Sequence, residues 1–192
     1  MDSLFQIDFA IFKFINSEAT HPWLDWLMPV ITDLHKQPAF IFSFLFLGIL
    51  YYFHKYKKRG LYYFLGCLVA LGCTDWFGAK LIKKNFERPR PFQTEGLEVI
   101  KRSNAHGYSF HSNHASNMFA FAYYNSYFFP PAKWFFYSMA VITCYSRVYN
   151  GVHFPFDVIF GALWGILMSF LIIQIIKRIE KRFGLSPVEP KK

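Results

Sequence analysis

The sequence predicts an all-α membrane protein: a polytopic bundle of about six membrane helices, the first of them short or partial, plus an N-terminal interfacial helix. Three observations carry this prediction. Hydrophobic residues make up 54% of the chain and aromatic residues 22%, although the net charge is +9. The apolar residues form long runs, and most charges fall between the runs. A soluble domain of 192 residues would leave much of this apolar surface exposed, so a membrane is the natural solvent.

The length corresponds to one domain, which we assign to residues 1–192. Its first segment, residues 3–16, has apolar side chains largely on one side of a helix, and Asp8 interrupts the pattern. This suits a helix that lies in the membrane interface. The next apolar run, Trp23–Leu34, is short for a hydrocarbon core of ~30 Å. We expect a tilted or partial first span there, and whether residues 22–35 cross fully stays open.

Five longer helices are predicted from the remaining apolar runs. The last contains Val158–Ile176, nineteen residues without a charge, which is the clearest spanning signal. Prolines end the second helix and open a polar loop, residues 85–112. The basic tail, residues 177–192, is expected to be frayed. The five helices are Ala39–Phe53, Leu61 to about Lys84, Asn113–Phe129, Trp134 to about Tyr149, and Phe154–Ile176.

The basic clusters predict the orientation of these helices. Lys55–Arg59 is placed in the cytoplasm because inner loops carry an excess of Lys and Arg. Successive crossings then bring the 85–112 loop and Ser146–His153 to the outer face, and return Lys177–Arg182 to the cytoplasm. We therefore expect an integral protein of the inner (plasma) membrane whose functional residues lie on the periplasmic or outer face.

Those functional residues begin with an arginine, a histidine and an aspartate between the last two apolar runs. If the chain is helical from His153 onward, His153 and Asp157 lie four residues apart on one face. An aspartate there can fix the imidazole tautomer and leave the other nitrogen basic. Arg147 adds a planar guanidinium suited to phosphate oxygens. A His–Asp pair alone is more often structural, so the interpretation depends on upstream residues.

Two upstream blocks supply those residues. Lys83 and Arg90 stand seven apart before a proline, and Ser112 and His114 follow in the sequence Ser-Phe-His-Ser-Asn-His. In order, the three blocks read Lys-x6-Arg-Pro, Ser-x-His and Ser-Arg-x5-His-x3-Asp. This pattern resembles the type 2 phosphatidic acid phosphatase (PAP2) superfamily of membrane lipid phosphatases, which shares its site with vanadium haloperoxidases.

The resemblance implies a phosphatase that uses no metal and no cofactor. It makes His153 the nucleophile that forms a phosphohistidine and Asp157 the residue that holds it. It makes His114 the acid that protonates the leaving group and the base that then activates water. The phosphate-binding residues it implies are Lys83, Arg90, Ser112, Asn113 and Arg147.

The middle block departs from the family's Pro-Ser-Gly-His. Asn113 replaces the glycine, and because asparagine tolerates left-handed backbone conformations, its amide is expected still to reach a phosphate. Its side chain is also able to bond to substrate or loop. His111 replaces the proline, which removes stiffness from the loop. These changes bear on substrate preference and rate, not on the class of reaction.

Two other charged residues have interpretations that stay open. Arg88 precedes a proline and stands two residues from Arg90, so it suits either phosphate binding or the membrane interface. Asp75 lies inside an apolar run, where an ionised group is costly without a partner. We expect it to pair with Lys80 or a basic loop residue, or to lie nearer the surface.

The composition also limits the partners. The basic excess suits anionic lipid head groups better than nucleic acid, because the charges flank apolar runs. Cys67, Cys73 and Cys144 lie within apolar stretches, which predicts core residues without disulfides or metal-ligand spacing. The N-terminus lacks the pattern of a cleaved signal peptide, so it is expected to be retained.

The predicted partners are therefore membrane lipids and a lipid phosphate or diphosphate substrate. The small size and the N-terminal pattern look like compact bacterial family members that act on undecaprenyl diphosphate, lipid A 1-phosphate or phosphatidylglycerophosphate. Analogy favours the first two. A vanadate-dependent haloperoxidase and a non-enzymatic protein that binds anionic lipids are the more distant alternatives. The sequence chooses neither the lipid nor the oligomeric state.

Overall fold

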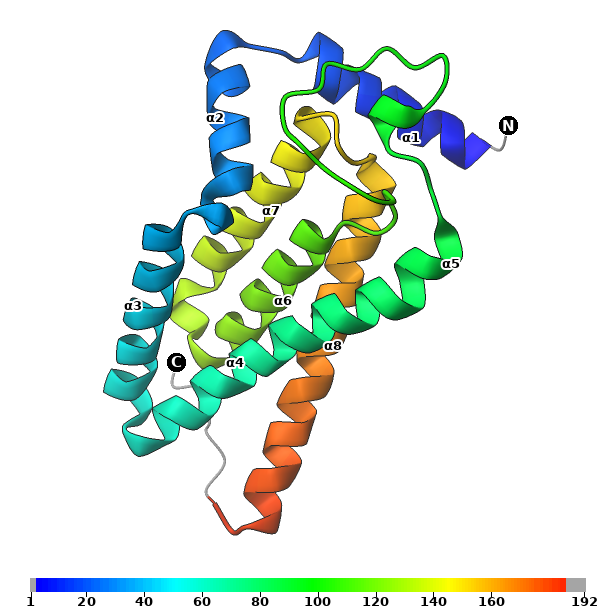
Figure 1. Ribbon diagram of the computed structural model, residues 1–192. Coiled ribbons are helices and arrows are strands. Elements are labelled where there is room, and N and C mark those ends of the chain that lie inside the picture. Colours follow the sequence, from blue (N-terminus) through cyan, green and yellow to red (C-terminus); the bar gives the residue numbers. More distant parts are fainter. Residues whose placement is uncertain (1–2, 186–192) are drawn as a thin grey trace.

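The computed structural model describes residues 3–185, and every regular element in that range is a helix (Figure 1). This confirms the predicted all-α class. Two longer helices, α4 and α8, cross the bundle, and π-helical turns extend α1 at Phe14–Glu18 and α4 at Gly78–Lys83. The α-helices are α1 (Ser3–Lys13), α2 (Pro22–Asp33), α3 (Pro38–Tyr56), α4 (Lys58–Phe77), α5 (Lys84–Phe86), α6 (Asn113–Phe128), α7 (Lys133–Tyr149) and α8 (Pro155–Arg182).

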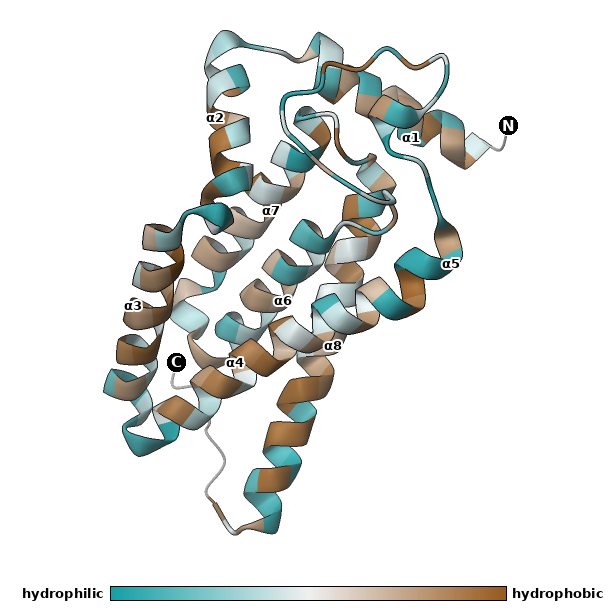
Figure 2. Cartoon of the chain, in the orientation of Figure 1, coloured by the Kyte–Doolittle hydropathy of each residue, from teal (hydrophilic) through white to brown (hydrophobic). Residues whose placement is uncertain are grey.

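Three segments within the described residues are long and apolar enough to cross a membrane: Pro38–Tyr56, Lys58–Gln93 and Pro155–Arg182. Figure 2 shows hydrophobic residues along most of α3 and α8. The helices α2, α6 and α7 have 12, 16 and 17 residues, which makes them shorter than a typical span. A bundle with membrane-spanning helices is therefore supported, and the count of six stays a prediction.

The last helix is longer than the sequence predicted. It continues to Arg182, so the expectation of a frayed tail is wrong for residues 177–182. The reason is that Glu180 is buried and accepts a hydrogen bond from the Tyr63 hydroxyl, which holds the final turn against α4. The remainder of the predicted tail, residues 186–192, lies outside the described residues.

Small residues set the central contact between α6 and α8. A Cβ atom added at Gly161 would lie 2.6 Å from the Ser112 carbonyl oxygen, and one at Gly165 would lie 2.0 Å from the Ser116 oxygen. Only glycine permits so close an approach of two backbones, as in other small-xxx-small helix pairs. The Ser112 amide consequently reaches the Asp157 carbonyl at 3.0 Å, which fixes the start of α6 beside the start of α8.

The two ends of the bundle differ in composition. The aromatic end, where α3 turns into α4, contains six buried rings: Tyr52, Tyr63, Phe64, Tyr124, Phe128 and Phe129. The opposite end carries the loop of residues 87–112, and α1 lies across it (Figure 1). We name this opposite end the polar end, because the charged side chains described below gather there. The predicted placement of α1 in a membrane interface stays a prediction, although its Leu4 and Phe5 side chains are exposed.

Candidate active site

The centre of the polar end is the turn between α7 and α8. His153 lies in this turn, before α8 begins at Pro155, so the helix starts one residue after the predicted Phe154 and does not include His153. The proline starts the helix, and the Asp157 carboxylate accepts the Phe154 amide at 2.8 Å as the first turn forms. The turn nevertheless brings Asp157 Oδ2 to 3.6 Å from His153 Nδ1. The predicted pair is therefore present, with a different local backbone.

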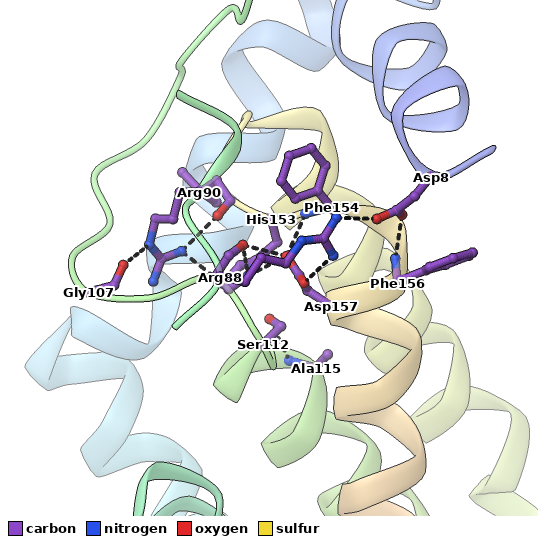
Figure 3. A network of polar contacts seen from close by, with 12 residues as sticks. Asp8, Arg88, Arg90, Gly107, Ser112, Ala115, His153, Phe154, Phe156 and Asp157 are labelled. Atoms are coloured by element: carbon purple, nitrogen blue, oxygen red, sulfur yellow. Dashed lines mark hydrogen bonds and ion pairs between the residues drawn. The ribbon is translucent and has the colours of Figure 1, made fainter. Parts of the chain in front are cut away.

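Ser109 joins this pair, although no role for it was predicted from the sequence. Its hydroxyl donates to Asp157 Oδ2 and lies 3.4 Å from His153 Nδ1. Ser109 is fully buried and comes from the loop before α6. The only available signal was its position three residues before Ser112 in the middle block. One carboxylate oxygen of Asp157 thus faces both the hydroxyl and the imidazole (Figure 3).

Burial controls the protonation of His153. The side chain is 2% exposed, and this burial lowers the pKa of its imidazole to about 3 despite the hydrogen bond to Asp157. The ring is therefore neutral at pH 7. With its proton on Nδ1, toward Asp157, the Nε2 atom carries a lone pair. A guanidinium nitrogen of Arg90 lies 3.1 Å from Nε2.

Arg90 is held by the backbone of two loops. Its guanidinium donates to the carbonyl oxygens of His106, Gly107 and Val152 at 2.7–2.8 Å. These contacts fix the plane of the guanidinium beside His153 (Figure 3). The side chain is buried, so its charge acts in a medium where anions bind strongly.

Arg147 and Lys83 add two more cations nearby. Arg147 is 3% exposed and donates to the Thr32 hydroxyl at 2.7 Å. Its buried Nε–H has no partner among residues 3–185. An unpaired buried donor is costly, and an anion would satisfy it. Lys83 is half-buried, and the charges of Arg90, Arg147 and Asp157 act on its ammonium group.

The start of α6 contributes Ser112, Asn113 and His114. Ser112 caps the helix by accepting the Ala115 amide at 3.4 Å, and its hydroxyl hydrogen remains available to a ligand. Asn113 is the first helical residue, so the expected left-handed backbone is not found. Helix N-termini attract anions because their first amides point outward without partners. His114 is half-buried and lines an adjoining cavity.

Asn113 also explains the charge inside α4. Its side-chain amide donates to Asp75 at 2.7 Å. Asp75 is exposed, which agrees with the expected position nearer the surface, and its charge also acts on the Lys83 ammonium group. The uncharged donor from α6 meets Asp75 because the last turn of α4 passes the start of α6.

The adjoining cavity extends from these polar groups into the apolar part of the bundle. It has a volume of about 610 Å³ and is bordered by α2, α3, α4, α6 and α7. Asp75, Asn113 and His114 lie in its wall, and apolar side chains form most of the remainder: Ile31, Leu34, Phe40, Met118, Met139 and Ile142. The cavity therefore has a polar part and an apolar part next to each other. This suits an amphiphilic ligand, which has a polar head and an apolar body.

Arg88, whose role the sequence left open, does not join the other cations. Its two terminal nitrogens contact Asp8 at 2.5 Å and Asp157 at 2.8 Å. It is thus occupied by two carboxylates (Figure 3). Asp8, which interrupts the apolar pattern of α1, is fully buried in this contact. Among the described residues, no group of three His, Cys, Asp or Glu side chains has the geometry of a metal site.

Comparison with known proteins shows a family to which this chain is similar. Residues 59–181 match the family model described as the PAP2 superfamily. The chain is 27% identical to the lipid A 4′-phosphatase of Porphyromonas gingivalis, over 99% of this chain and 82% of the relative. It is 30% identical to phosphatidylglycerophosphatase B of Bacillus subtilis, over 83% of this chain and 79% of the relative.

A solved structure gives the same result for the fold. The crystal structure of a transmembrane PAP2-type phosphatidylglycerolphosphate phosphatase from Bacillus subtilis superposes with a TM-score of 0.72. The alignment has 26% sequence identity and covers 93% of this chain and 89% of that one. The similarity therefore extends over the N-terminal helices as well as the matched family segment.

Proposed function

Because this chain belongs to the PAP2 superfamily, we propose that it is a membrane-embedded phosphatase that hydrolyses a lipid phosphate or diphosphate through a phosphohistidine intermediate. The observation that carries the proposal is the environment of His153. Its Nδ1 faces the Asp157 carboxylate, and its Nε2 faces the guanidinium of Arg90. A neutral imidazole held in this way is a nucleophile beside an anion-binding group.

The first step forms a bond between His153 Nε2 and phosphorus while the bond from phosphorus to the leaving oxygen breaks. Arg90, Arg147 and Lys83 neutralise the charge on the equatorial oxygens, and the α6 N-terminus adds dipoles of the same sign. Because Arg90 now contacts Nε2, its terminal nitrogen must turn to a phosphate oxygen when substrate binds. The leaving oxygen takes a proton from His114.

The second step returns the enzyme to its starting state. Water attacks phosphorus, the bond between phosphorus and His153 breaks, and His114 accepts the proton from the water. Asp157 stabilises the imidazole while it carries the phosphoryl group, as the aspartate does in other His–Asp pairs. Inorganic phosphate then leaves. Ser112 and Asn113 complete the set of groups that hold the phosphate in both steps.

We place this reaction at the outer face of the inner membrane. The support is that Lys55–Arg59 and the C-terminal turn of α8 share one end of the bundle, while all three sequence blocks meet at the other (Figure 1). Basic clusters favour the cytoplasmic side. The domain is taken as residues 1–192, with α1 and its following turn as the interfacial helix.

The substrates we favour are undecaprenyl diphosphate and a lipid A phosphate. The relative named lipid A 4′-phosphatase, which aligns with 99% of this chain, supports the second of these. Phosphatidylglycerophosphate is the other candidate, because a 30% identical relative carries that name. The cavity beside His114 has room for the part of an apolar chain that lies next to the phosphate in any of these lipids.

The test is phosphate release from the three lipids by the purified protein in detergent, with and without EDTA. We expect hydrolysis of at least one lipid in EDTA, its loss in His153→Ala, and near-normal rates in Lys101→Ala, whose charge lies exposed over the Phe92 ring. Activity retained in His153→Ala would contradict the proposal. Bromide oxidation with vanadate would favour a haloperoxidase, and lipid binding without hydrolysis would favour a non-enzymatic protein.

A further inference from the structure

The charged residue in α1 contacts the candidate active site. Asp8 has no exposed surface, and its two carboxylate oxygens have different partners. Oδ2 contacts the Arg88 guanidinium at 2.5 Å, and Oδ1 accepts the Phe156 amide at 2.8 Å. Phe156 belongs to the first turn of α8, one residue before Asp157. Asp8 is therefore bound to the same turn that presents Asp157 to His153.

Arg88 connects the two carboxylates. Its second terminal nitrogen contacts Asp157 Oδ1 at 2.8 Å, while Asp157 Oδ2 faces Ser109 and His153. The two oxygens of Asp157 thus have separate tasks: one is held by Arg88 and the other faces the imidazole. The Arg88 guanidinium also lies 4.1 Å from the Phe154 ring centroid, which limits its movement. We call these contacts of Arg88 with Asp8 and Asp157 the Arg88 bridge.

Helix α1 is fixed along its C-terminal half and by the turn that follows it. Phe9 and Phe12 pack edge-on against Phe154 with ring centroids 5.1 and 5.3 Å apart. In the π-helical turn that follows, Asn16 donates to the carbonyl oxygens of Ile100 and Tyr149 at 2.9 and 2.8 Å. Asp8 is consequently held as part of a packed helix and does not depend on a flexible segment.

We propose that Asp8 and Arg88 are positioning residues for the hydrolysis, and that through the Arg88 bridge α1 sets the orientation in which Asp157 holds His153. Neither residue needs to touch the substrate. The bridge stops the Asp157 carboxylate from rotating, so its Oδ2 stays directed at Ser109 and His153. A carboxylate that orients a reactive histidine is itself commonly fixed by such outer contacts. This inference rests on the function proposed above.

The geometry also separates Arg88 from the phosphate-binding cations. A guanidinium paired with two carboxylates has little net charge to offer an anion, whereas Arg90 is held by neutral carbonyl groups and Arg147 by a hydroxyl. Substitution of Arg88 should therefore change the rate of the chemical step more than the binding of substrate. Substitution of Arg90 or Arg147 should change both.

The test compares Asp8→Asn, Arg88→Lys and Arg88→Gln with wild type, using the full chain in detergent. Asp8→Asn keeps the shape and an oxygen acceptor for Phe156 but removes the charge. Asp25→Asn is the matched control, because Asp25 pairs with the loop residue Arg102 at 2.7 Å at the same end and does not touch Asp157. The readouts are kcat, KM, the unfolding temperature, and the inhibition constants of vanadate and phosphate.

We expect kcat to fall about 10-fold in Asp8→Asn and about 100-fold in Arg88→Gln, with KM changed less than about 2-fold. Arg88→Lys should lie between them, because an ammonium group cannot reach both carboxylates as a planar fork does. Vanadate, which bonds to the nucleophile, should bind more weakly while phosphate binding is retained. Asp25→Asn should keep its kcat within about 2-fold of wild type, since the Asp25 side chain is 44% exposed and Arg102 keeps its hydrogen bonds to the carbonyl oxygens of Asn16 and Tyr149.

The proposal is overturned if Asp8→Asn and Arg88→Gln keep full kcat, or if their losses match Asp25→Asn at equal unfolding temperature. An equal weakening of vanadate and phosphate would also contradict it, because a loosened structure affects both. His153→Ala in the same assay separates the two proposals. If it remains active, the phosphohistidine mechanism fails; if it alone is inactive, only the positioning role fails.

Discussion

The two ends of the bundle are stabilised in different ways. At the polar end, single atoms from distant segments meet: one oxygen of Asp157 faces His153, and the other contacts Arg88. At the aromatic end, rings pack against rings, with the centroids of Tyr63 and Phe128 4.8 Å apart. The polar end depends on the direction of hydrogen bonds and on charge, and the aromatic end depends on the packing of large side chains. Changes at the polar end should therefore alter the reaction, and changes at the aromatic end should alter stability.

At the aromatic end, hydroxyl groups of the packed rings are satisfied by nearby acceptors. The Tyr52 hydroxyl donates to Asn125 at 2.9 Å, and the Tyr124 hydroxyl donates to the Tyr63 carbonyl oxygen at 2.8 Å. Each such ring pair contributes about 0.5–1.5 kcal/mol beyond its buried area, so many small terms add up. No single contact dominates there, in contrast to the few ion pairs around His153.

The largest expected effect is that of His114→Ala on the reaction. Removal of the proposed general acid should lower kcat/KM for a lipid phosphate by about 10²–10⁴-fold. The loss should be much smaller for p-nitrophenyl phosphate, whose leaving group needs no proton. Parallel assays of both substrates check this, with unfolding temperature as the control. An equal loss for both substrates would contradict the assigned role.

Arg147→Lys should give the next largest loss. Lysine keeps the positive charge but lacks the planar fork and the Nε–H that is unpaired among the described residues. We expect a loss of about 100-fold in kcat/KM, comparable with removal of one donor from an oxyanion hole. Steady-state kinetics with the hydrolysed lipid measure it. Full activity in this variant would show that charge alone is needed.

Gly165→Ala tests the contact between α6 and α8, the two helices that run between the polar end and the aromatic end. The added methyl would lie 2.0 Å from the Ser116 oxygen, so α6 and α8 must separate. We expect a loss of about 1–3 kcal/mol in the free energy of unfolding, together with lower activity, because Ser112 moves away from Asp157. Gly72→Ala is the matched control, since nothing lies within 4 Å of its added Cβ and alanine favours the helix. Denaturant titration in detergent compares the two.

Acid should affect the polar end specifically. The pKa of His153 is about 3 in the fold and about 6.5 in an unfolded chain, so the unfolded state binds the proton more readily. Stability therefore falls as pH drops below 6.5, by roughly 1 kcal/mol at pH 5.5. His153→Asn cannot titrate and should lose less. Thermal unfolding of both proteins at pH 7.5 and 5.5 measures the difference, and equal losses would refute the assignment.

Tyr63→Phe should have the smallest effect on the reaction. It removes the hydroxyl that donates to the buried Glu180 carboxylate at the aromatic end, which costs about 1.5–3 kcal/mol of unfolding free energy. Tyr62→Phe is the control, because the Tyr62 hydroxyl has no partner among residues 3–185. Both variants should keep normal kcat. Loss of activity in Tyr63→Phe would mean that the two ends are coupled.

The sequence predicted much of the polar end, because its chemistry is encoded by residue type and spacing. The three blocks are found together, and the elements that carry them agree with the predicted helices within a few residues. Asp8, Ser109 and Arg88 could not be assigned, since their partners are far away in the chain: Asp8 and Arg88 are eighty residues apart. Periodicity shows only that Asp8 interrupts an apolar face, and not which cation meets it.

The α6–α8 contact was missed for a different reason. Gly161 and Gly165 lie within the longest apolar run, where hydropathy alone reads glycine as a neutral residue. Their significance depends on Ser112 and Ser116 in another helix. The length of α8 was similarly underestimated, because the partner that buries Glu180 is Tyr63 in α4. In both cases tertiary contacts decide what local pattern leaves open.

The position of Asp8 has a consequence for recombination between related enzymes. It lies before residue 59, where the family segment begins, yet it contacts Arg88 inside that segment. A chimera that grafts a foreign N-terminal helix onto this catalytic half would inherit Arg88 without its acidic companion. Donor and recipient halves would have to be chosen as a matched set, with that one carboxylate serving as the criterion of compatibility.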